Sequence, residues 1–255
     1  MFRSTLRTVK LLCLAGVALV ASGVPVAALN VQPVVLDLLS SGRRSSAVIT
    51  LQNTFTTTVP VELVARPVEL VDGEFRELDE ESEDLLVFPA TATVEPGQSQ
   101  AFRVQWVGDP AITASRHYYV SVAQLPVQLP ENENAVQVLY NFKVLVSVGA
   151  NGANSALAVV SATIETDANG RSTPVINVSN TGTTYGYLGR GRITITQRNA
   201  AGATIFRESF EPDEIQRRMG LGLIPSGATR SLPINLDLPS AEGSITVDIA
   251  PVEGR

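Results

Sequence analysis

The sequence predicts an all-β protein made of two sandwich domains. Short segments rich in Val, Ile, Thr and aromatic residues recur along the chain, and turns containing Gly, Pro, Asn or Asp separate them. No segment keeps a 3.6-residue apolar period for longer than a turn or two. Once an expected leader of 28 residues is removed, 227 of the 255 residues remain. That length is enough for two domains of about 100 residues each, the size of an immunoglobulin-like β-sandwich.

Residues 1–28 have the features of a secretory signal peptide. Arg3, Arg7 and Lys10 form a positive segment, an apolar stretch follows, and small residues precede the cleavage that we expect after Ala28. The alternative is an uncleaved membrane anchor. The apolar stretch argues against it, because Gly, Ser and Pro interrupt it and a spanning helix needs about 20 mostly apolar residues. We therefore expect an exported chain.

The charge and cysteine content of the exported chain exclude several functions. Residues 29–255 carry 16 Lys and Arg against 25 Asp and Glu, a net charge of −9, which disfavours nucleic acid as a partner. The single cysteine, Cys13, lies in the leader, so the exported chain has no disulfide, no thiol nucleophile and no thiolate metal site. Its stability must come from packed cores.

The strand signals fall into two sets around a flexible segment. Residues 149–155 (GANGANS) are small and polar, which is typical of a linker. We expect an N-terminal domain over residues 29–148 and a C-terminal domain over residues 156–255. The strands expected in the first domain are 29–37, 46–53, 59–65, 86–87 with 92–94, 98–107, 117–125 and 135–148. Those expected in the second are 158–165, 174–179, 192–197, 204–210, 230–238 and 244–252.

The acidic run at residues 74–84 has two interpretations. A calcium loop would need carboxylates at alternate positions followed by glycine, so that they wrap around the ion. The run lacks that spacing. We therefore expect a solvated loop.

Residues 135–148 (AVQVLYNFKVLVSV) form the most informative segment. Because strand side chains alternate between faces, Val136, Val138, Tyr140 and Phe142 begin one wholly apolar row that runs to the end of the segment. A strand of this length would extend about 45 Å, more than one sandwich covers. One interpretation is that the uncovered half is an edge offered to another polypeptide, the client, which adds a strand there. The alternative is a long central strand of an ordinary sandwich.

Lys143 lies within this segment, on the face opposite the apolar row. It is the only lysine after Lys10. One interpretation is that its side chain extends into solvent and discourages unwanted edge pairing. The other is that it faces the inter-domain cleft and receives the terminal carboxylate of the client, fixing the register of the added strand by a charge-assisted hydrogen bond.

Four segments together resemble the periplasmic pilus-assembly chaperones of the chaperone–usher pathway. Residues 116–126 (RHYYVSVAQLP) are similar to the signature strand of that family, in which an aromatic, a small polar residue, alternating aliphatics and a proline precede the donor strand. Residues 30–38 (NVQPVVLDL) are similar to its first strand, residues 94–104 (VEPGQSQAFRV) to its fifth strand, and residues 179–182 (SNTG) to a motif of its second domain. The resemblance extends over essentially all of residues 29–255.

The resemblance implies two immunoglobulin-like sandwiches set at an angle, with client-binding residues Val136, Val138, Tyr140, Phe142 and Lys143 on the donor strand. The implied function is a periplasmic chaperone that stabilises pilin-like subunits by donating an edge strand and delivers them to an outer-membrane usher for fimbrium assembly. It implies no cofactor, no metal and no small-molecule substrate. Whether the client-free chain covers its apolar edge by self-association stays open.

The chain departs from the family pattern at three places. The family has an arginine in the first strand that acts with a donor-strand lysine on the client's C-terminus, and Val35 stands in its place. The alignment suggested by the end of the strand places Leu145 at the position of the family lysine, and Lys143 takes that position if the strand is shifted by two residues. Ser115 and Gly149 with Ala150 replace charged residues, so we expect the family's usual inter-domain ion pairs to be absent.

Two other classes of function are an enzyme and a structural subunit. An enzyme would have to use His117, the only histidine, but no Gly-x-Ser-x-Gly turn accompanies it and a histidine metal site needs a second ligand. We therefore expect a protein without enzymatic activity and a structural role for His117. The alternative to a chaperone is an immunoglobulin-like surface or fimbrial structural subunit.

Overall fold

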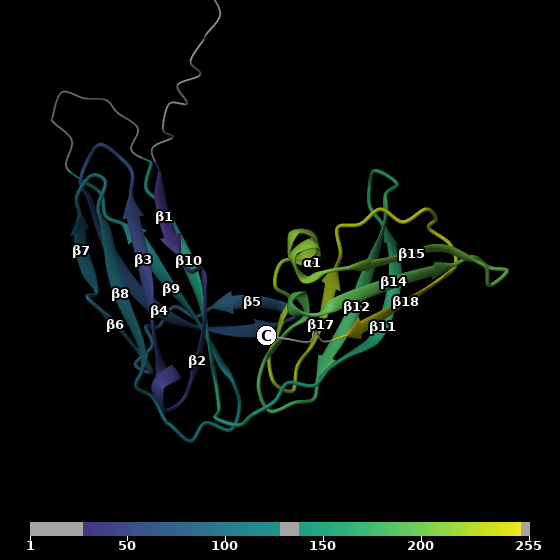
Figure 1. The fold of residues 1–255 in the computed structure, drawn as a ribbon, viewed down its shortest axis with the longest axis horizontal. Coiled ribbons are helices and arrows are strands. Elements are labelled where there is room, and N and C mark those ends of the chain that lie inside the picture. The colour runs from purple at the N-terminus through teal and green to yellow at the C-terminus, as the bar shows by residue number, and fades with distance from the viewer. Residues whose placement is uncertain (1–27, 128–137, 251–255) are drawn as a thin grey trace, which may run out of the picture.

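The computed structural model describes residues 28–127 and 138–250, which form two immunoglobulin-like β-sandwich domains (Figure 1). The predicted all-β, two-domain fold is confirmed. In Figure 1 the domains form the two arms of a V. The expected leader lies almost wholly in residues 1–27, outside the described residues. Within the described ranges no helix is long and apolar enough to cross a membrane.

The first domain consists of two sheets packed face to face. One has the order β1-β3-β8-β6: β1 (Leu29–Gln32), β3 (Ser46–Asn53), β8 (Ser99–Trp106) and β6 (Leu85–Phe88). The other has the order β2-β10-β9-β4-β5, with β7 beside β4: β2 (Val35–Leu39), β10 (Asn141–Gly149), β9 (Arg116–Gln124), β4 (Val59–Val71), β5 (Glu74–Glu77) and β7 (Thr91–Val94). A short 3-10 turn, η1 (Arg43–Ser45), precedes β3.

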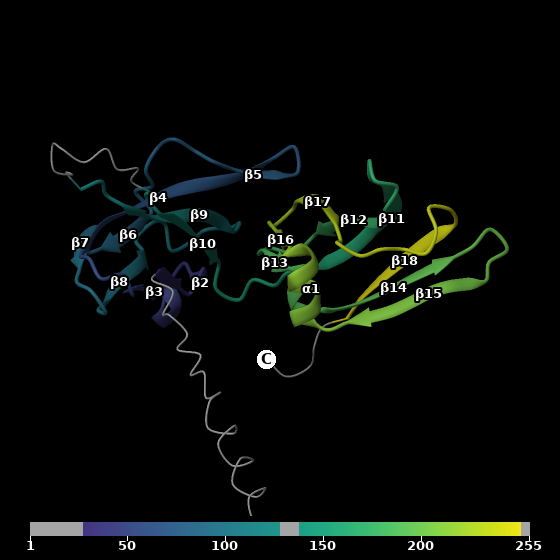
Figure 2. The ribbon, with the colours of Figure 1, turned by 90° about the horizontal axis from the view of Figure 1, so that it is seen from above.

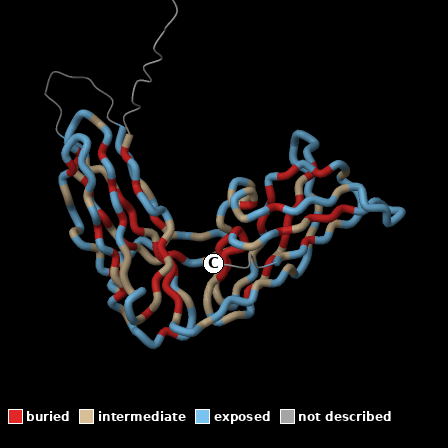
Figure 3. The backbone as a smooth tube through the Cα atoms, viewed as in Figure 1, coloured by how far each residue is buried: buried red, intermediate tan, exposed pale blue. Residues whose placement is uncertain are grey.

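Alternate residues of these strands point into one core, as strand geometry requires. Figure 3 shows this burial along the inner strands of both domains. The largest fully buried side chains of the first domain are Tyr118, Phe102, Leu38, Ile49 and Leu51.

The second domain carries smaller sheets around its own core. Its strands are β11 (Leu157–Thr166), β12 (Ser172–Asn180), β13 (Gly186–Tyr187), β14 (Arg192–Arg198), β15 (Thr204–Phe210), β16 (Leu223–Ile224), β17 (Thr229–Pro233) and β18 (Ser244–Ala250). They form sheets of order β11-β12-β17, β13-β16 and β15-β14-β18, with a 3-10 turn η2 (Leu188–Arg190) after β13.

The second domain also contains a helix that the sequence did not predict, α1 (Pro212–Met219). Proline opens it, and Glu211 and Glu214 form a reciprocal capping box at its start. Only Ile215 is buried, so the helix presents too little apolar surface to show a period in the sequence.

The expected strands 29–37 and 59–65 differ in the structure. The strand expected over residues 29–37 is two strands in different sheets, since the chain breaks at Pro33, whose nitrogen has no hydrogen to donate to a ladder. The strand expected to end at residue 65 continues to Val71 and turns into β5. The prediction of a solvated loop over residues 74–84 is therefore wrong for residues 74–77, which form β5. This strand pairs with β4 from Val68↔Glu77 to Val71↔Glu74.

The β4–β5 hairpin extends beyond the first sandwich toward the second domain (Figure 2). Arg230 of β17 donates from Nε to the carbonyl oxygen of Gly73 at the hairpin tip, 3.2 Å away, and its guanidinium lies 4.7 Å from the ring centre of Phe75. The hairpin is therefore an inter-domain contact as well as a sheet edge.

Candidate functional site

The segment singled out from the sequence is a shorter strand than expected. The prediction of one continuous strand over residues 135–148 is wrong, because β10 comprises Asn141–Gly149 and residues 138–140 precede it outside any strand. Its neighbour β9 ends at Gln124, whose nitrogen donates to the carbonyl oxygen of Tyr140, so β9 has no residue left to pair with the chain before Tyr140. Residues 135–137 of the expected strand, including Val136, lie outside the described residues.

One edge of β10 is only partly covered. β9 pairs with β10 along its length, from Asn141↔Ala123 to Val148↔Arg116. On the other edge β2 pairs in parallel from Leu145↔Val35 onward. Among the described residues no strand pairs with that edge over residues 141–144. The sheet therefore ends in a half-strand with a free edge.

The free edge carries specific backbone groups. Tyr140 accepts a hydrogen bond from Gln124 of β9, and on the opposite edge the Leu145 nitrogen donates to Val34. Since the two backbone polar groups of a strand residue point to the same edge, those of Asn141 and Lys143 point away from β9. These groups are available to an added strand.

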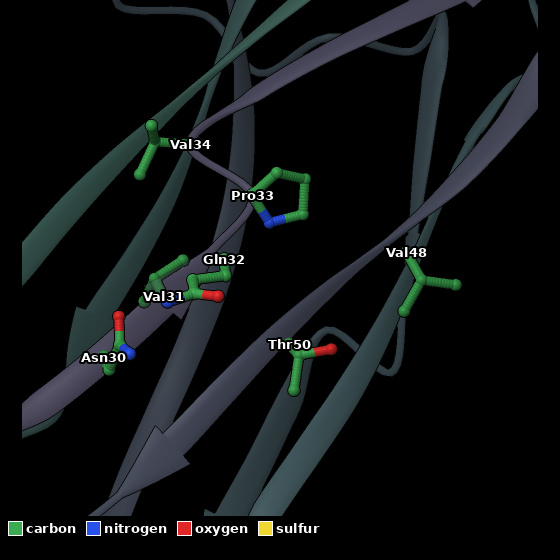
Figure 4. Close-up of a pocket in the computed structure, with 7 residues that line it drawn as sticks. All are labelled: Asn30, Val31, Gln32, Pro33, Val34, Val48 and Thr50. Carbon is green, nitrogen blue, oxygen red and sulfur yellow. The ribbon is translucent and has the colours of Figure 1, made fainter.

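The chain from β1 to β2 borders this free edge. β1 is the outer strand of its sheet, and the chain then crosses through Pro33 and Val34 to β2 in the opposite sheet. A shallow groove follows the crossing, lined by Asn30, Val31, Gln32, Pro33, Val34, Val48 and Thr50 (Figure 4). Val34 is 58 % exposed and its carbonyl oxygen bonds Leu145, so the groove adjoins the place where the edge of β10 becomes free.

Apolar side chains precede the free edge and continue along it. Val138 is 66 % exposed and Tyr140 is 41 % exposed, whereas Phe142 is partly buried against the core. The rings of Tyr140 and Phe142 are stacked with centres 6.2 Å apart, and Phe55 lies 5.8 Å from Tyr140. The row runs on into the fully buried Val144. It thus begins in solvent and ends in the core.

Lys143 projects from the other face of β10, which turns toward the second domain. Its Nζ atom contacts both carboxylate oxygens of Glu77 on β5, at 2.7 and 2.5 Å. Arg66 of β4 is the second cation near this carboxylate, with Nη1 at 3.9 Å. The lysine that the sequence suggests as a client anchor therefore has an internal carboxylate partner, Glu77.

A polar cluster joins the two domains. Asp37 of β2 accepts hydrogen bonds from the hydroxyls of Tyr185 and Tyr187, each at 2.9 Å, and pairs with Arg190 at 2.6 Å. Burial, reinforced by the Asp37 charge, raises the pKa of both tyrosines, so they remain donors. From the sequence we expect the family's usual inter-domain ion pairs to be absent. Nothing in the sequence indicates the Asp37–Arg190 pair that joins the domains in the structure.

His117 extends the same cluster into the first domain. Its Nδ1 lies 3.0 Å from the hydroxyl of Ser147, which in turn lies 3.1 Å from the Tyr187 hydroxyl. Burial lowers the pKa of His117 to about 4, against a smaller opposing effect of Asp37. The ring is neutral and bonded in the interior. Among the described residues no group of three or more His, Cys, Asp or Glu side chains is placed to hold a metal ion.

No family model and no curated protein matches this sequence. Solved structures do match its fold. A chain from the structure of a chaperone–tip adhesin complex of CFA/I fimbriae biogenesis is similar over 90 % of this chain and 94 % of its own, with a TM-score of 0.53 and 12 % identity. The class 5 fimbriae chaperone CfaA is similar over 88 % of this chain and all of its own, with a TM-score of 0.52 and 13 % identity.

A third similar structure is that of the Salmonella enterica SafA pilin in complex with the SafB chaperone. It covers 89 % of this chain and 91 % of the matched chain, with a TM-score of 0.52 and 15 % identity. At these identities the likeness establishes the fold. The fold of this chain is that of the fimbrial chaperones, in agreement with the resemblance found in the sequence.

Arg66 and Glu77 are the residues of this site that sequence reasoning missed. Glu77 lies in the acidic run, and its charge offered a signal because it is opposite to that of the single lysine of β10. Nothing in the spacing joined the two residues, which are 66 positions apart. Only the fold-back of β5 on β4 brings them together.

Proposed function

We propose that this chain is a periplasmic chaperone that binds pilin-like subunits by adding a strand of its own to their incomplete sheet. The observation that carries the proposal is the free edge of β10 beside the exposed Val138 and Tyr140. The fold shared with fimbrial chaperones supports it. In this proposal the chain has no enzymatic activity, and it delivers the subunit to an outer-membrane usher, the partner that the family resemblance implies.

The free edge supplies the affinity of such a complex. The backbone groups of Asn141 and Lys143 can form ladder hydrogen bonds with a strand of the client, which is how strand addition holds two chains together. An unpaired sheet edge is an aggregation hazard that proteins normally protect. A free edge beside apolar side chains is explained if a strand of the client pairs with it.

The apolar row supplies the specificity. Side chains at alternate positions enter the groove of an added sheet, so Val138, Tyr140 and Phe142 would fill successive pockets of the client. Val136 would extend the row by one pocket. The increasing burial from Val138 to Val144 would make the core of the client continuous with that of the chaperone.

The test replaces Val138 and Tyr140 with aspartate and measures which pilin-like subunit co-purifies from periplasmic extracts. The unchanged chain should retain a subunit in a one-to-one complex that protects it from proteolysis. The variant should lose at least 90 % of it, since two buried charges cost several kcal/mol, about a thousandfold in affinity.

A matched control is Val160→Asp on β11, where the valine is 63 % exposed but belongs to the second domain. This variant should keep the subunit. Equal recovery with the Val138 and Tyr140 variant would contradict the proposal, provided that circular dichroism shows both variants folded. A chain recovered as a surface polymer would instead support a structural subunit.

A further inference from the structure

We infer that Phe55, in the loop between β3 and β4, is a positioning residue of the strand-donating site, because its ring holds the ring of Tyr140 in place before a subunit binds. The inference rests on the proposed function, since it concerns how the apolar row is presented to a subunit. It adds to that row a residue from a separate part of the chain.

Three aromatic rings meet at the start of β10. The ring centres of Phe55 and Tyr140 are 5.8 Å apart, and their planes are inclined by 42°. The rings of Tyr140 and Phe142 are stacked at 6.2 Å, with planes only 9° apart. Aromatic pairs with centres within about 7 Å attract each other beyond the effect of the apolar area that they bury. Tyr140 is therefore held by one ring of its own segment and by one ring of the β3–β4 loop.

The loop that carries Phe55 is fixed by a buried asparagine. Asn53 ends β3 and is 0 % exposed. Its Nδ2 atom donates to the carbonyl oxygens of Thr57 and Val94, and its Oδ1 atom accepts from the Phe55 nitrogen, each at 2.9 Å. Both donors and the acceptor of this side-chain amide are thus bonded. The loop, and with it Phe55, has a defined position in the absence of a subunit.

The backbone contacts of Tyr140 leave its ring to be oriented by these neighbours. Tyr140 lies before β10, outside any strand. Its carbonyl oxygen accepts from the Gln124 nitrogen at 2.8 Å, and its nitrogen lies 3.4 Å from the Gln124 side-chain oxygen. These bonds fix the backbone and not the side-chain torsions. The contacts with Phe55 and Phe142 restrict those torsions.

The burial of the three rings favours positioning over competition with a subunit. Phe55 and Phe142 are partly buried against the core, whereas Tyr140 is 41 % exposed. A subunit core that continues the core of the first domain can cover the exposed part of Tyr140 without removing the ring from Phe55. A ring that is already restricted loses less rotational freedom on binding, so the contact with Phe55 should increase the affinity.

The experiment replaces the Phe55 ring with an aliphatic side chain that still packs against the core. The probe is a synthetic peptide of about seven residues in which Val alternates with Thr, long enough to span positions 138–144, and binding is measured by fluorescence anisotropy. Phe55→Leu should weaken binding by about fivefold, the effect of losing one aromatic pair. Phe55→Tyr keeps the ring and should bind like the unchanged chain.

A matched control is Phe88→Leu on β6, where the phenylalanine is 69 % exposed and belongs to the opposite sheet. This variant makes the same substitution in the same domain and should leave the affinity unchanged. Urea unfolding of each variant shows that it is folded under the conditions of the binding measurement.

A double-mutant cycle tests whether Phe55 acts through Tyr140. In a Tyr140→Leu chain, the further change Phe55→Leu should have no effect on the affinity, because the ring that Phe55 holds is gone. The NMR signals of the Tyr140 ring protons should shift in Phe55→Leu and stay in place in Phe88→Leu. A general loss of stability would produce neither result.

The outcomes separate this inference from the proposed function. Equal or tighter binding by Phe55→Leu, or the same loss of affinity in the Tyr140→Leu chain, would overturn the role of Phe55 and leave strand addition standing. Failure of the peptide to bind the unchanged chain and every variant would contradict strand addition and this inference together.

Discussion

His117 is a buried neutral base held between the two domains. Its imidazole contacts Ser147 and lies 5.4 Å from the ring of Tyr185 and 6.2 Å from that of Phe75. Protonation would place a charge among aromatic rings, with Asp37 as the one nearby anion that favours it. Protonation of His117 is therefore expected to destabilise the inter-domain cluster.

The lowered pKa of His117 predicts a loss of stability in acid. Below about pH 6.5 the unfolded chain binds a proton at this residue that the folded chain does not bind until about pH 4. The unfolded state therefore gains protons as pH falls through this window, and the free energy of unfolding decreases. The contribution of His117 is present above pH 6.5 and should fall by about 3 kcal/mol by pH 4.

Urea unfolding of the chain and of His117→Gln between pH 7 and 4 measures this contribution. The acidic residues titrate equally in both proteins, so the difference between the two curves isolates His117. The variant should be less stable at pH 7 and should lose less stability on acidification. Parallel curves would show that the pKa of His117 is the same in the folded and the unfolded chain.

At the scale of the element, β10 has two different halves. Residues from Leu145 onward have a strand on each side, whereas residues 141–144 have only β9. The C-terminal half of β10 is therefore held on both edges, and its N-terminal half has one free edge. The β4–β5 hairpin projects along the neighbouring face and delivers Glu77 to Lys143.

Amide hydrogen exchange should show an alternating pattern in the first half of β10. The nitrogens of Asn141 and Lys143 point to the free edge and should exchange orders of magnitude faster than those of Phe142 and Val144, which face β9. Binding of a subunit along this edge should slow the exchange of the Asn141 and Lys143 amides specifically. Equal protection of all four amides in the client-free chain would show that the edge is already covered.

The elements could be predicted from the sequence only where the pattern is local. β3 was placed at its observed bounds and β8 to within a residue, since alternation and turn residues define both. The start of β10 was misplaced because the apolar alternation of residues 135–140 continues beyond its partner β9. The β4–β5 hairpin was missed because Glu77, Asp79 and their neighbours carry the charge of a loop, while the pairing that makes a strand is formed with residues 68–71.

At the scale of the whole molecule, Asp37 links the domains through three partners on the second one. Tyr185, Tyr187 and Arg190 all converge on its carboxylate. Arg230 makes a second, separate link to the hairpin tip. Together with the Tyr187–Ser147 hydrogen bond, these contacts join the two domains.

Replacement of Asp37 by alanine should loosen this arrangement. The loss of the shared acceptor leaves the partly buried Tyr185 hydroxyl without a partner, leaves Tyr187 only its bond to Ser147 and removes the ion pair of Arg190. An unsatisfied buried hydroxyl costs about 1–3 kcal/mol. We expect a lower free energy of unfolding and a broader distribution of shapes by small-angle X-ray scattering. Asp248→Ala, at an exposed site on β18, should change neither. Identical scattering of the Asp37 variant and the unchanged chain would show that other contacts fix the domains.

The sequence by itself determined the all-β class and the two-domain size, because alternation, turn chemistry and length are local or additive properties of the chain. It also singled out the apolar row of Val138, Tyr140 and Phe142. The tertiary structure alone decided which backbone groups of β10 stay free, since pairing depends on where β2 and β9 end. It likewise decided that Glu77 meets Lys143 and that Asp37 meets Arg190, because contacts between residues 66 and 153 positions apart are set by packing.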